Sequence, residues 1–218
     1  MNAPAPLTIT PETHGALVEF FTTLYGTDSG GYLMIGTVTP GRTSFDVHWH
    51  QAADPDGAAD LALSLAAGAN VYFGVGLHPE PLSGNRRGTA DRVVTLPGLW
   101  ADVDIAHDVH KKAKHLPPTV EAAQELVMSM GPKPSIVVHT GHGLQAYWLF
   151  DGPVTFTSPE HRDEFKNLSE RWGETLKSRA AERRWKVDST FDISRVLRVP
   201  YTVNRKAEPV PVRIMEVR

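Results

Sequence analysis

The order of strand-like and helix-like segments after residue 98 is the feature that most restricts the fold of this chain. An apolar strand around residues 98–105 is followed by the helical segment TVEAAQELVMSM, which Gly131-Pro132 ends. The strands PSIVVH and LQAYWLF are joined through TGHG, which is typical of a hairpin. Ser158-Pro159 opens a long helix, and PVPVRIMEV predicts a final strand. This βαββαβ order predicts an antiparallel sheet of the split βαβ plan.

The first 78 residues predict a smaller αβ unit. Thr10 and Pro11 suit the start of a helix. The strand-like runs GYLMIGTV and TSFDVHWHQ flank Pro40-Gly41, and a short helix near 57–67 precedes the strand NVYFGVGL. We predict one α/β (α+β) domain, in which the unit of residues 1–78 packs on an RNA-recognition-motif-like module of residues 79–218. Because that module serves many functions, the activity has to be argued from the site.

Composition excludes several kinds of site. The 218 residues include no cysteine, so disulfides, thiolate zinc sites and cysteine nucleophiles are excluded. His, Asp and Glu remain as metal ligands. No apolar run approaches the ~18–20 residues that span a bilayer. The N-terminus MNAPAPLTITPE lacks the charged and apolar regions of a signal peptide, so we expect no membrane partner and a cytoplasmic location.

Two aspartates interrupt the apolar strand LWADVDI. Asp102 and Asp104 stand one residue apart, so the period of two in a strand places both carboxylates on one face. Two unpaired carboxylates in a largely buried strand are costly, whereas a divalent cation offsets both charges. Oxygen ligands suit a hard ion, so this pair predicts a site for Mg²⁺ or Mn²⁺. An exposed pair at a strand end is the alternative.

The turn between the two hairpin strands is a candidate anion site. Gly141 and Gly143 allow the backbone to approach a ligand closely, and successive N–H groups in such a turn can point at phosphate. In a βαββαβ sheet, this hairpin lies next to the strand that bears Asp102 and Asp104. Thr140, Gly141, Gly143 and Gln145 are therefore candidate nucleotide-binding residues, unless the turn is an ordinary glycine turn.

The segment VDSTFDISRVLRVPYTVNRK combines acidic and basic side chains. Carboxylates for a metal beside cations for phosphate are what a nucleoside triphosphate site needs. From Lys177 to Lys206 we count nine basic residues against three acidic ones, although the whole chain has a net charge of −3. Such a local basic surface can attract nucleic acid, and the alternative is a solvated helix face. The candidates in this segment are Asp188, Asp192, Arg195, Arg198, Asn204, Arg205 and Lys206.

Taken together, three stretches resemble the archaeo-eukaryotic primase superfamily, particularly the primase-polymerases (prim-pols) of phages, plasmids and other mobile elements. LWADVD is similar to the DxD/E motif of that family, and SIVVHTGHGLQAYWLF to its second motif. VDSTFDISRVLRVPYTVNRK resembles the third motif with its trailing Arg-x-Pro-x-Thr-x-Asn-x-Lys. The resemblance covers roughly residues 70–206 and implies a catalytic site between the N-terminal unit and the module.

The resemblance implies template-directed nucleotidyl transfer on single-stranded DNA, with primer synthesis and extension from NTPs or dNTPs. Asp102 and Asp104 would hold two catalytic metals, Mg²⁺ or Mn²⁺, with Asp188 or its rival Asp192 as the third carboxylate. Arg198, Asn204 and Lys206 would face the triphosphate. The chain stops soon after the last predicted strand, so we expect a fragment of a longer replication protein with a helicase, acting in the cytoplasm of a bacterial host.

Two positions depart from the family pattern. The family commonly has a histidine where this chain has Gln145, and His142 is the available substitute for contacting phosphate. The glycine usual before Thr-x-Asn is here Tyr201, which puts the local turn in question.

Two rival functions remain open. His48-Trp49-His50 could present two imidazoles to a metal, as in replication-initiator endonucleases and relaxases. Those enzymes need a tyrosine nucleophile on a later helix, and the long helix that begins at Pro159 contains none. The second rival is a non-catalytic single-stranded nucleic-acid-binding module, which would read bases with exposed aromatics on the strands that here carry carboxylates.

Overall fold

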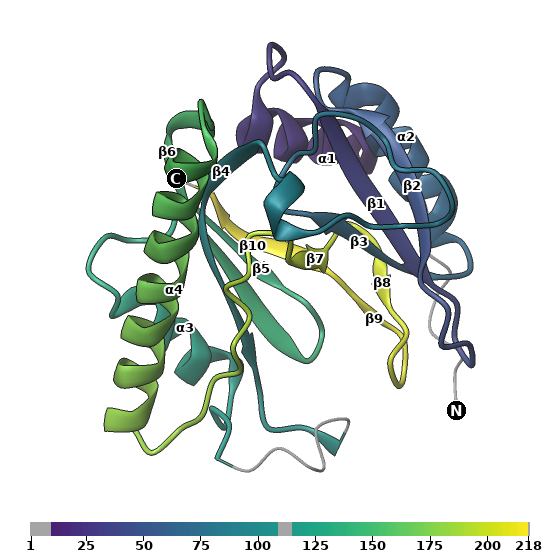
Figure 1. The fold of residues 1–218 in the computed structure, drawn as a ribbon. Helices are drawn as coiled ribbons and strands as arrows, with labels where there is room; N and C mark the ends of the chain where they lie inside the picture. Colours follow the sequence, from purple (N-terminus) through teal and green to yellow (C-terminus); the bar gives the residue numbers. More distant parts are fainter. Residues whose placement is uncertain (1–9, 109–114, 218) are drawn as a thin grey trace.

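A computed structural model describes residues 10–108 and 115–217, and its helices and strands follow the expected order with a few differences (Figure 1). The N-terminal unit contains α1 (Pro11–Tyr25), β1 (Tyr32–Val38), β2 (Asp46–Gln51), α2 (Pro55–Ala66) and β3 (Asn70–Gly74). The remaining elements are η1 (Ala90–Arg92), β4 (Thr95–Asp104), α3 (Val120–Met128), β5 (Ile136–His139), β6 (Gly143–Thr155), α4 (Pro159–Glu182), β7 (Val196–Arg198), β8 (Val203–Asn204), β9 (Val210–Pro211) and β10 (Arg213–Val217).

Local sequence explains where the helices begin. The side chains of Thr10, Asp54, Thr119 and Ser158 each accept a hydrogen bond from a backbone N–H in the first turn of α1, α2, α3 and α4, respectively. A proline occupies the start of three of these helices, where the missing N–H is not needed. Within the described residues, no helix is long and apolar enough to cross a bilayer.

The strands form two four-stranded antiparallel sheets. The first sheet has the order β2-β1-β3-β7 and the second has the order β10-β5-β6-β4. The hairpin β5–β6 lies beside β4, as the βαββαβ order predicts. The last strand differs from the split βαβ plan, because β10 pairs with β5 at the far edge rather than with β4. The chain thus has the expected α+β class, and β4 is an edge strand of its sheet.

Two segments differ from the sequence prediction. The βαββαβ prediction places no strand in residues 187–206, but Val196–Arg198 forms a strand that pairs with β3. The C-terminal half therefore completes the sheet of the N-terminal unit. The final segment is split into β9 and β10 rather than forming one strand. Val212 lies between them, where its carbonyl accepts the N–H of Tyr201 and its N–H donates to the carbonyl of Thr202.

The core has two parts, one on each face of the second sheet. Helices α3 and α4 cover one face, where Ala101, Val103 and Trp148 are buried. On the other face, Trp100 and Tyr147 join the core formed by α1, α2 and the first sheet. The ring of Phe20 on α1 contacts both Phe73 of the first sheet and Tyr147 of the second, so α1 packs against both sheets. The packing of α1 against both sheets therefore fixes the position of the first sheet relative to the second, and the candidate site lies between them.

Candidate active site

The two aspartates of β4 share one face of the second sheet. Ala101 and Val103 point into the core under α3 and α4, so the alternation of side chains directs Asp102 and Asp104 to the opposite face. That face changes character along the strand: Trp100 lies opposite Tyr147 in the apolar core, whereas Asp102 lies opposite Gln145. The polar end of this face forms one wall of a cavity of about 380 Å³.

The cavity gathers side chains from both sheets and from the segments that follow α4. It is lined by Tyr72, Asp102, Asp104, Thr140, His142, Gln145, Asp188, Arg195, Val196, Arg198, Asn204 and Lys206. Ten of these are candidates from the sequence, and they come from three stretches of the chain. Of the candidates in those stretches, Gly141, Gly143, Asp192 and Arg205 do not line it.

The carboxylate of Asp102 is in an unfavourable place for a negative charge. Removal from water raises its pKa, and the neighbouring charge of Asp104 raises it further. Arg195 and Arg198 act in the opposite direction, and the Nη2 atom of Arg195 lies 3.6 Å from Oδ2 of Asp102. Two carboxylates that share a partly buried wall are a suitable pair of oxygen ligands for a hard divalent cation.

Asp188 and Asp192 lie at different places. Asp188 is exposed and lines the cavity, whereas the side chain of Asp192 is turned back onto its own loop. Its Oδ1 atom accepts hydrogen bonds of 2.9 Å from both the backbone N–H and the hydroxyl of Ser194. This local turn is a common use of aspartate and leaves Asp188 as the acidic neighbour of Asp102 and Asp104.

Arg198 is held in the cavity by the first sheet. Its guanidinium donates to Oδ1 of Asn70 at 3.0 Å and lies 4.8 Å from the ring centre of Tyr72. The same Asn70 oxygen accepts the backbone N–H of Arg205 at 2.8 Å. Arg198 is buried, and burial lowers its pKa from the ordinary value. A buried guanidinium that neighbouring side chains hold in place is well prepared to bind an anion.

The glycine turn has a structural explanation. Gly141 has a φ of 92°, and a side chain at Gly143 would collide with the backbone of Val103 on β4. The Thr140 N–H donates to the carbonyl of Gly143 at 2.9 Å, so this donor is used inside the turn rather than offered to an anion. His142, between the two glycines, is buried and lines the cavity. His142 is therefore not a solvent-exposed turn residue.

Asn204 and Tyr201 connect this turn to the C-terminal segment. The side-chain amide of Asn204 donates to the carbonyl of Thr140 at 2.7 Å, and its oxygen accepts the N–H of Lys206 at 3.0 Å. Tyr201 has a φ of 61°, in the left-handed region that glycine adopts without strain. Asn204 positions both Thr140 and Lys206.

Sequence analysis did not identify Tyr72, Val196 and Asn70 as parts of the site. Tyr72 alternates with the buried Val71 and Phe73, so its place on the opposite face is readable from the pattern. The packing of the two sheets places this face of β3 next to the aspartates, and a local sequence pattern does not predict that packing.

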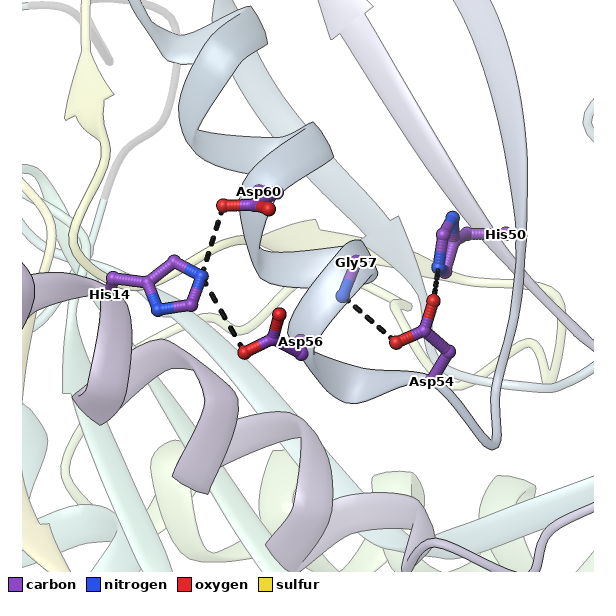
Figure 2. Close-up of polar contacts among 6 residues, drawn as sticks. All are labelled: His14, His50, Asp54, Asp56, Gly57 and Asp60. Carbon is purple, nitrogen blue, oxygen red and sulfur yellow. Dashed lines mark hydrogen bonds and ion pairs between the residues drawn. The ribbon is translucent and has the colours of Figure 1, made fainter.

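His48 and His50 do not belong to the cavity. Both lie opposite core residues of β1, so they face the helix side of the first sheet. The Nε2 atom of His50 is 2.8 Å from Oδ2 of Asp54, whose other oxygen caps α2 by accepting the N–H of Gly57 (Figure 2). The imidazole of His50 is therefore engaged with the start of α2.

A separate group of potential metal ligands lies near the same end of α2. The Nε2 atom of His14 is 3.0 Å from Asp60 and 4.0 Å from Asp56 (Figure 2). In the part of the chain that the structure describes, these are the three ligand side chains whose atoms lie within 4.8 Å of one another. The oxygens of Asp102, Asp104 and Asp188 share a cavity without being gathered to that degree. Both aspartates of the His14 group are largely exposed.

Comparisons with known proteins identify the fold. No family model and no curated protein sequence matches this chain. Among solved structures, the chain is similar to primase RepB′, with a TM-score of 0.51 and 16% identity over 92% of this chain and 56% of that one. The catalytic domain of primase RepB′ in complex with initiator DNA gives a TM-score of 0.51 and 17% identity, over 92% of this chain and 85% of that one.

A third similar structure is the polymerase domain of Ligase D from Mycobacterium tuberculosis in complex with DNA, with a TM-score of 0.43 and 15% identity over 98% of this chain and 86% of that one. This chain spans just over half of the full RepB′ primase chain. The two RepB′ matches show that the chain has the prim-pol fold, as the resemblance in its motifs implies.

Proposed function

We propose that this domain catalyses template-directed nucleotidyl transfer on single-stranded DNA, making primers and extending them from nucleoside triphosphates. One observation carries the proposal: Asp102 and Asp104 share a cavity of about 380 Å³ with Arg195, Arg198 and Lys206. Carboxylates beside cations in one cavity suit a triphosphate and its metal ions better than they suit an uncharged substrate. Similarity to a primase catalytic domain supports the proposal.

The residues of the cavity fit Mg²⁺ or Mn²⁺. All acidic side chains on its wall offer oxygen, and the raised pKa of Asp102 indicates a place where a cation would be stabilising. We propose that Asp102 and Asp104 are the principal ligands, with Asp188 as the third. When bound, the ions would activate a 3′-hydroxyl group and neutralise the leaving pyrophosphate.

The cationic side chains would bind and orient the triphosphate. Arg198 can present its guanidinium to phosphate oxygens while Asn70 and Tyr72 hold the other parts of the group. Lys206 adds a second positive charge, and its backbone N–H is held by a hydrogen bond to the side-chain oxygen of Asn204. Arg195, which contacts Asp102, can turn to the substrate once a metal ion neutralises that carboxylate.

The rival endonuclease function receives no support from the geometry. His48 and His50 lie on the helix side of the first sheet, and His50 is engaged with Asp54 (Figure 2). A non-catalytic binding module does not explain why two carboxylates occupy a partly buried wall, because they would repel a nucleic acid backbone.

The test is incorporation of labelled nucleotides on single-stranded DNA, with and without a primer, in Mg²⁺ or Mn²⁺. We expect products from the wild type and none from Asp102→Ala or Asp104→Ala. His48→Ala is the matched control, because it removes a possible ligand outside the cavity, and it should remain active. Incorporation by either aspartate variant at the wild-type rate contradicts the proposal.

A further inference from the structure

A second, wider cavity lies next to the candidate active site. It has a volume of about 800 Å³ and lies between the loop that precedes η1 and the segment around Ser194. Three arginines, Arg86, Arg87 and Arg92, are on its wall. Ser194 lines this cavity and Arg195 lines the active-site cavity, so a single peptide bond separates the two walls.

Two of the three arginines keep their charge available. Arg92 forms an ion pair with Glu80, with an N–O distance of 2.6 Å. Arg86 donates to the carbonyl of Ser83 at 2.9 Å, an uncharged partner. Among residues 10–108 and 115–217, no carboxylate forms an ion pair with Arg86 or Arg87. The loop therefore presents two positive charges to a ligand.

The loop that carries these arginines is fixed at both sides. The side chain of Asn85 accepts the N–H of Val47 at 2.6 Å and donates to the carbonyl of Phe45 at 3.0 Å. Asn85 thus hydrogen-bonds the backbone at the start of the edge strand β2, where a neighbouring strand would otherwise pair. On the other side, Gly88 has a φ of 80° and packs so closely on His78 that any side chain would overlap the imidazole. Arg86 and Arg87 lie between these two attachments, which reduces the entropy lost when they bind.

Aromatic rings continue from this loop to the active site. The guanidinium of Arg87 is 6.0 Å from the ring centre of Phe45, which lies against Gly36 where a side chain would collide with it. The ring of Phe45 is 6.0 Å from that of Tyr72, and Tyr72 lies 4.8 Å from Arg198. The two neighbouring rings of Phe45 and Tyr72 thus connect the guanidinium of Arg87 on the loop with that of Arg198 in the active-site cavity.

We infer that Arg86, Arg87 and Phe45 form a binding site for single-stranded nucleic acid that leads into the active site. Arginines that follow a backbone and rings that stack on bases are the usual components of sequence-independent single-strand sites. The inference rests on the proposed function, which requires a strand to enter the cavity of Asp102 and Asp104, and it identifies the residues that would guide that strand. Its ligand differs from a free nucleoside triphosphate in having single phosphodiester groups spaced along a chain of nucleosides.

The test is fluorescence anisotropy with a labelled oligonucleotide, a second oligonucleotide of the same length without bases, and ATP as a competitor. All measurements use the Asp102→Ala/Asp104→Ala background, so that no nucleotide is incorporated. Arg86→Ala/Arg87→Ala should weaken binding of both oligonucleotides about tenfold or more. It should also reduce the slope of log K against log salt by roughly 1.4, since each phosphate contact on a single strand contributes about 0.7.

Phe45→Leu tests the stacking component separately. It should weaken binding of the oligonucleotide that has bases by roughly fivefold to a hundredfold and leave binding of the abasic one unchanged. Phe45→Tyr should keep the wild-type affinity because it preserves the ring. The matched control is Lys133→Ala/Arg171→Ala, which removes two exposed positive charges outside both cavities and should bind as the parent does. Thermal unfolding of each variant checks that the fold is kept.

Three results overturn the inference. The first is an Arg86→Ala/Arg87→Ala variant that binds both oligonucleotides as tightly as the parent. The second is a loss of affinity in this variant no larger than that of the control variant, and the third is a loss of its affinity for ATP alone. Failure of the proposed function is seen differently, as a wild-type protein that binds DNA through this site and incorporates no nucleotide. Primer extension by the wild type, measured in parallel, therefore distinguishes the two failures.

Discussion

Arg195 reaches from the segment after α4 to Asp102 on β4, with its Nη2 atom 3.6 Å from Oδ2 of the carboxylate. This contact brings a positive charge to a wall where two aspartates repel each other. At 3.6 Å and with both side chains partly exposed, the pair is too weak to neutralise both carboxylates. The site therefore remains attractive to a divalent cation, and the following predictions start from that balance.

Asp102→Asn should abolish nucleotide incorporation without destabilising the protein. The pKa of Asp102 is raised by burial and by Asp104, so its charge opposes folding when no metal is bound. We expect incorporation to fall at least about a hundredfold. The free energy of unfolding in a chelating buffer should be within about 1 kcal/mol of the wild type, or higher. Chemical denaturation measures this, and a large loss of stability would mean that Asp102 has a structural role instead.

Arg198→Lys should impair nucleotide binding although it keeps the positive charge. Lysine cannot both hydrogen-bond Asn70 and lie flat on Tyr72 in the way that the guanidinium does. We expect KM for the nucleotide to rise about tenfold, in line with the loss of one charged hydrogen bond, with a smaller change in kcat. Arg179→Lys, at an exposed position paired with Glu182 on α4, is the control and should have wild-type kinetics.

His142→Ala and Gln145→Ala separate two ways of contacting the triphosphate. Both side chains line the cavity, but only histidine can carry a charge that phosphate would favour. Loss of a charged hydrogen bond costs about 1.5–3 kcal/mol, so His142→Ala should lower catalytic efficiency roughly tenfold to a hundredfold. Steady-state incorporation kinetics decide the question. If His142→Ala matches the wild type and Gln145→Ala alone is impaired, Gln145 performs this role by itself.

Gly173→Ala should destabilise the protein and displace the segment that carries Asp188 and Arg195. The ring of Phe191 lies so close to Gly173 on α4 that a methyl group would overlap it. We expect a loss of about 1–3 kcal/mol in the free energy of unfolding, together with reduced incorporation. Gly15→Ala on α1 has open space around it and serves as the control. Alanine should stabilise that helix by up to about 1 kcal/mol.

His78 should make the protein less stable in mild acid. Burial lowers its pKa from 6.5 to about 4, so the unfolded chain binds a proton more readily than the folded protein does. Stability should therefore fall as the pH decreases from about 6.5 towards 4, by up to about 3 kcal/mol, and the contribution is complete above pH 6.5. Chemical denaturation at several pH values should show a flatter profile for His78→Gln. Parallel profiles for the two proteins would assign the acid sensitivity to other groups.

Local sequence predicted most of the secondary structure because the signals it contains are short-range. Thr10, Thr119 and Ser158 are recognisable as helix caps since a capping side chain bonds within its own first turn. The alternation of Ala101, Asp102, Val103 and Asp104 already predicts the face of each side chain. The prim-pol fold was also predicted correctly, from three motifs in the right order.

Tertiary structure alone decided which strands meet. Val196–Arg198 is too short to be distinguished from a loop by pattern, and it becomes a strand because β3 offers an edge for it. That pairing carries Arg198 across to Tyr72 and Asn70, and it brings Arg195 beside Asp102. Likewise, the choice between Asp188 and Asp192 as a neighbour of the cavity follows from the turn that Ser194 makes with Asp192.

The sequence by itself thus determined the elements, the faces of their side chains and the chemical types in the candidate site. The packing of the first sheet against the second determined which of those side chains share a cavity. The physical reason is the range of the interactions. The alternation of side chains along a strand and the capping of a helix depend on neighbours in the chain. The contacts of Asp102 with Arg195 and of Tyr72 with Arg198 depend instead on the burial of α1 between the two sheets.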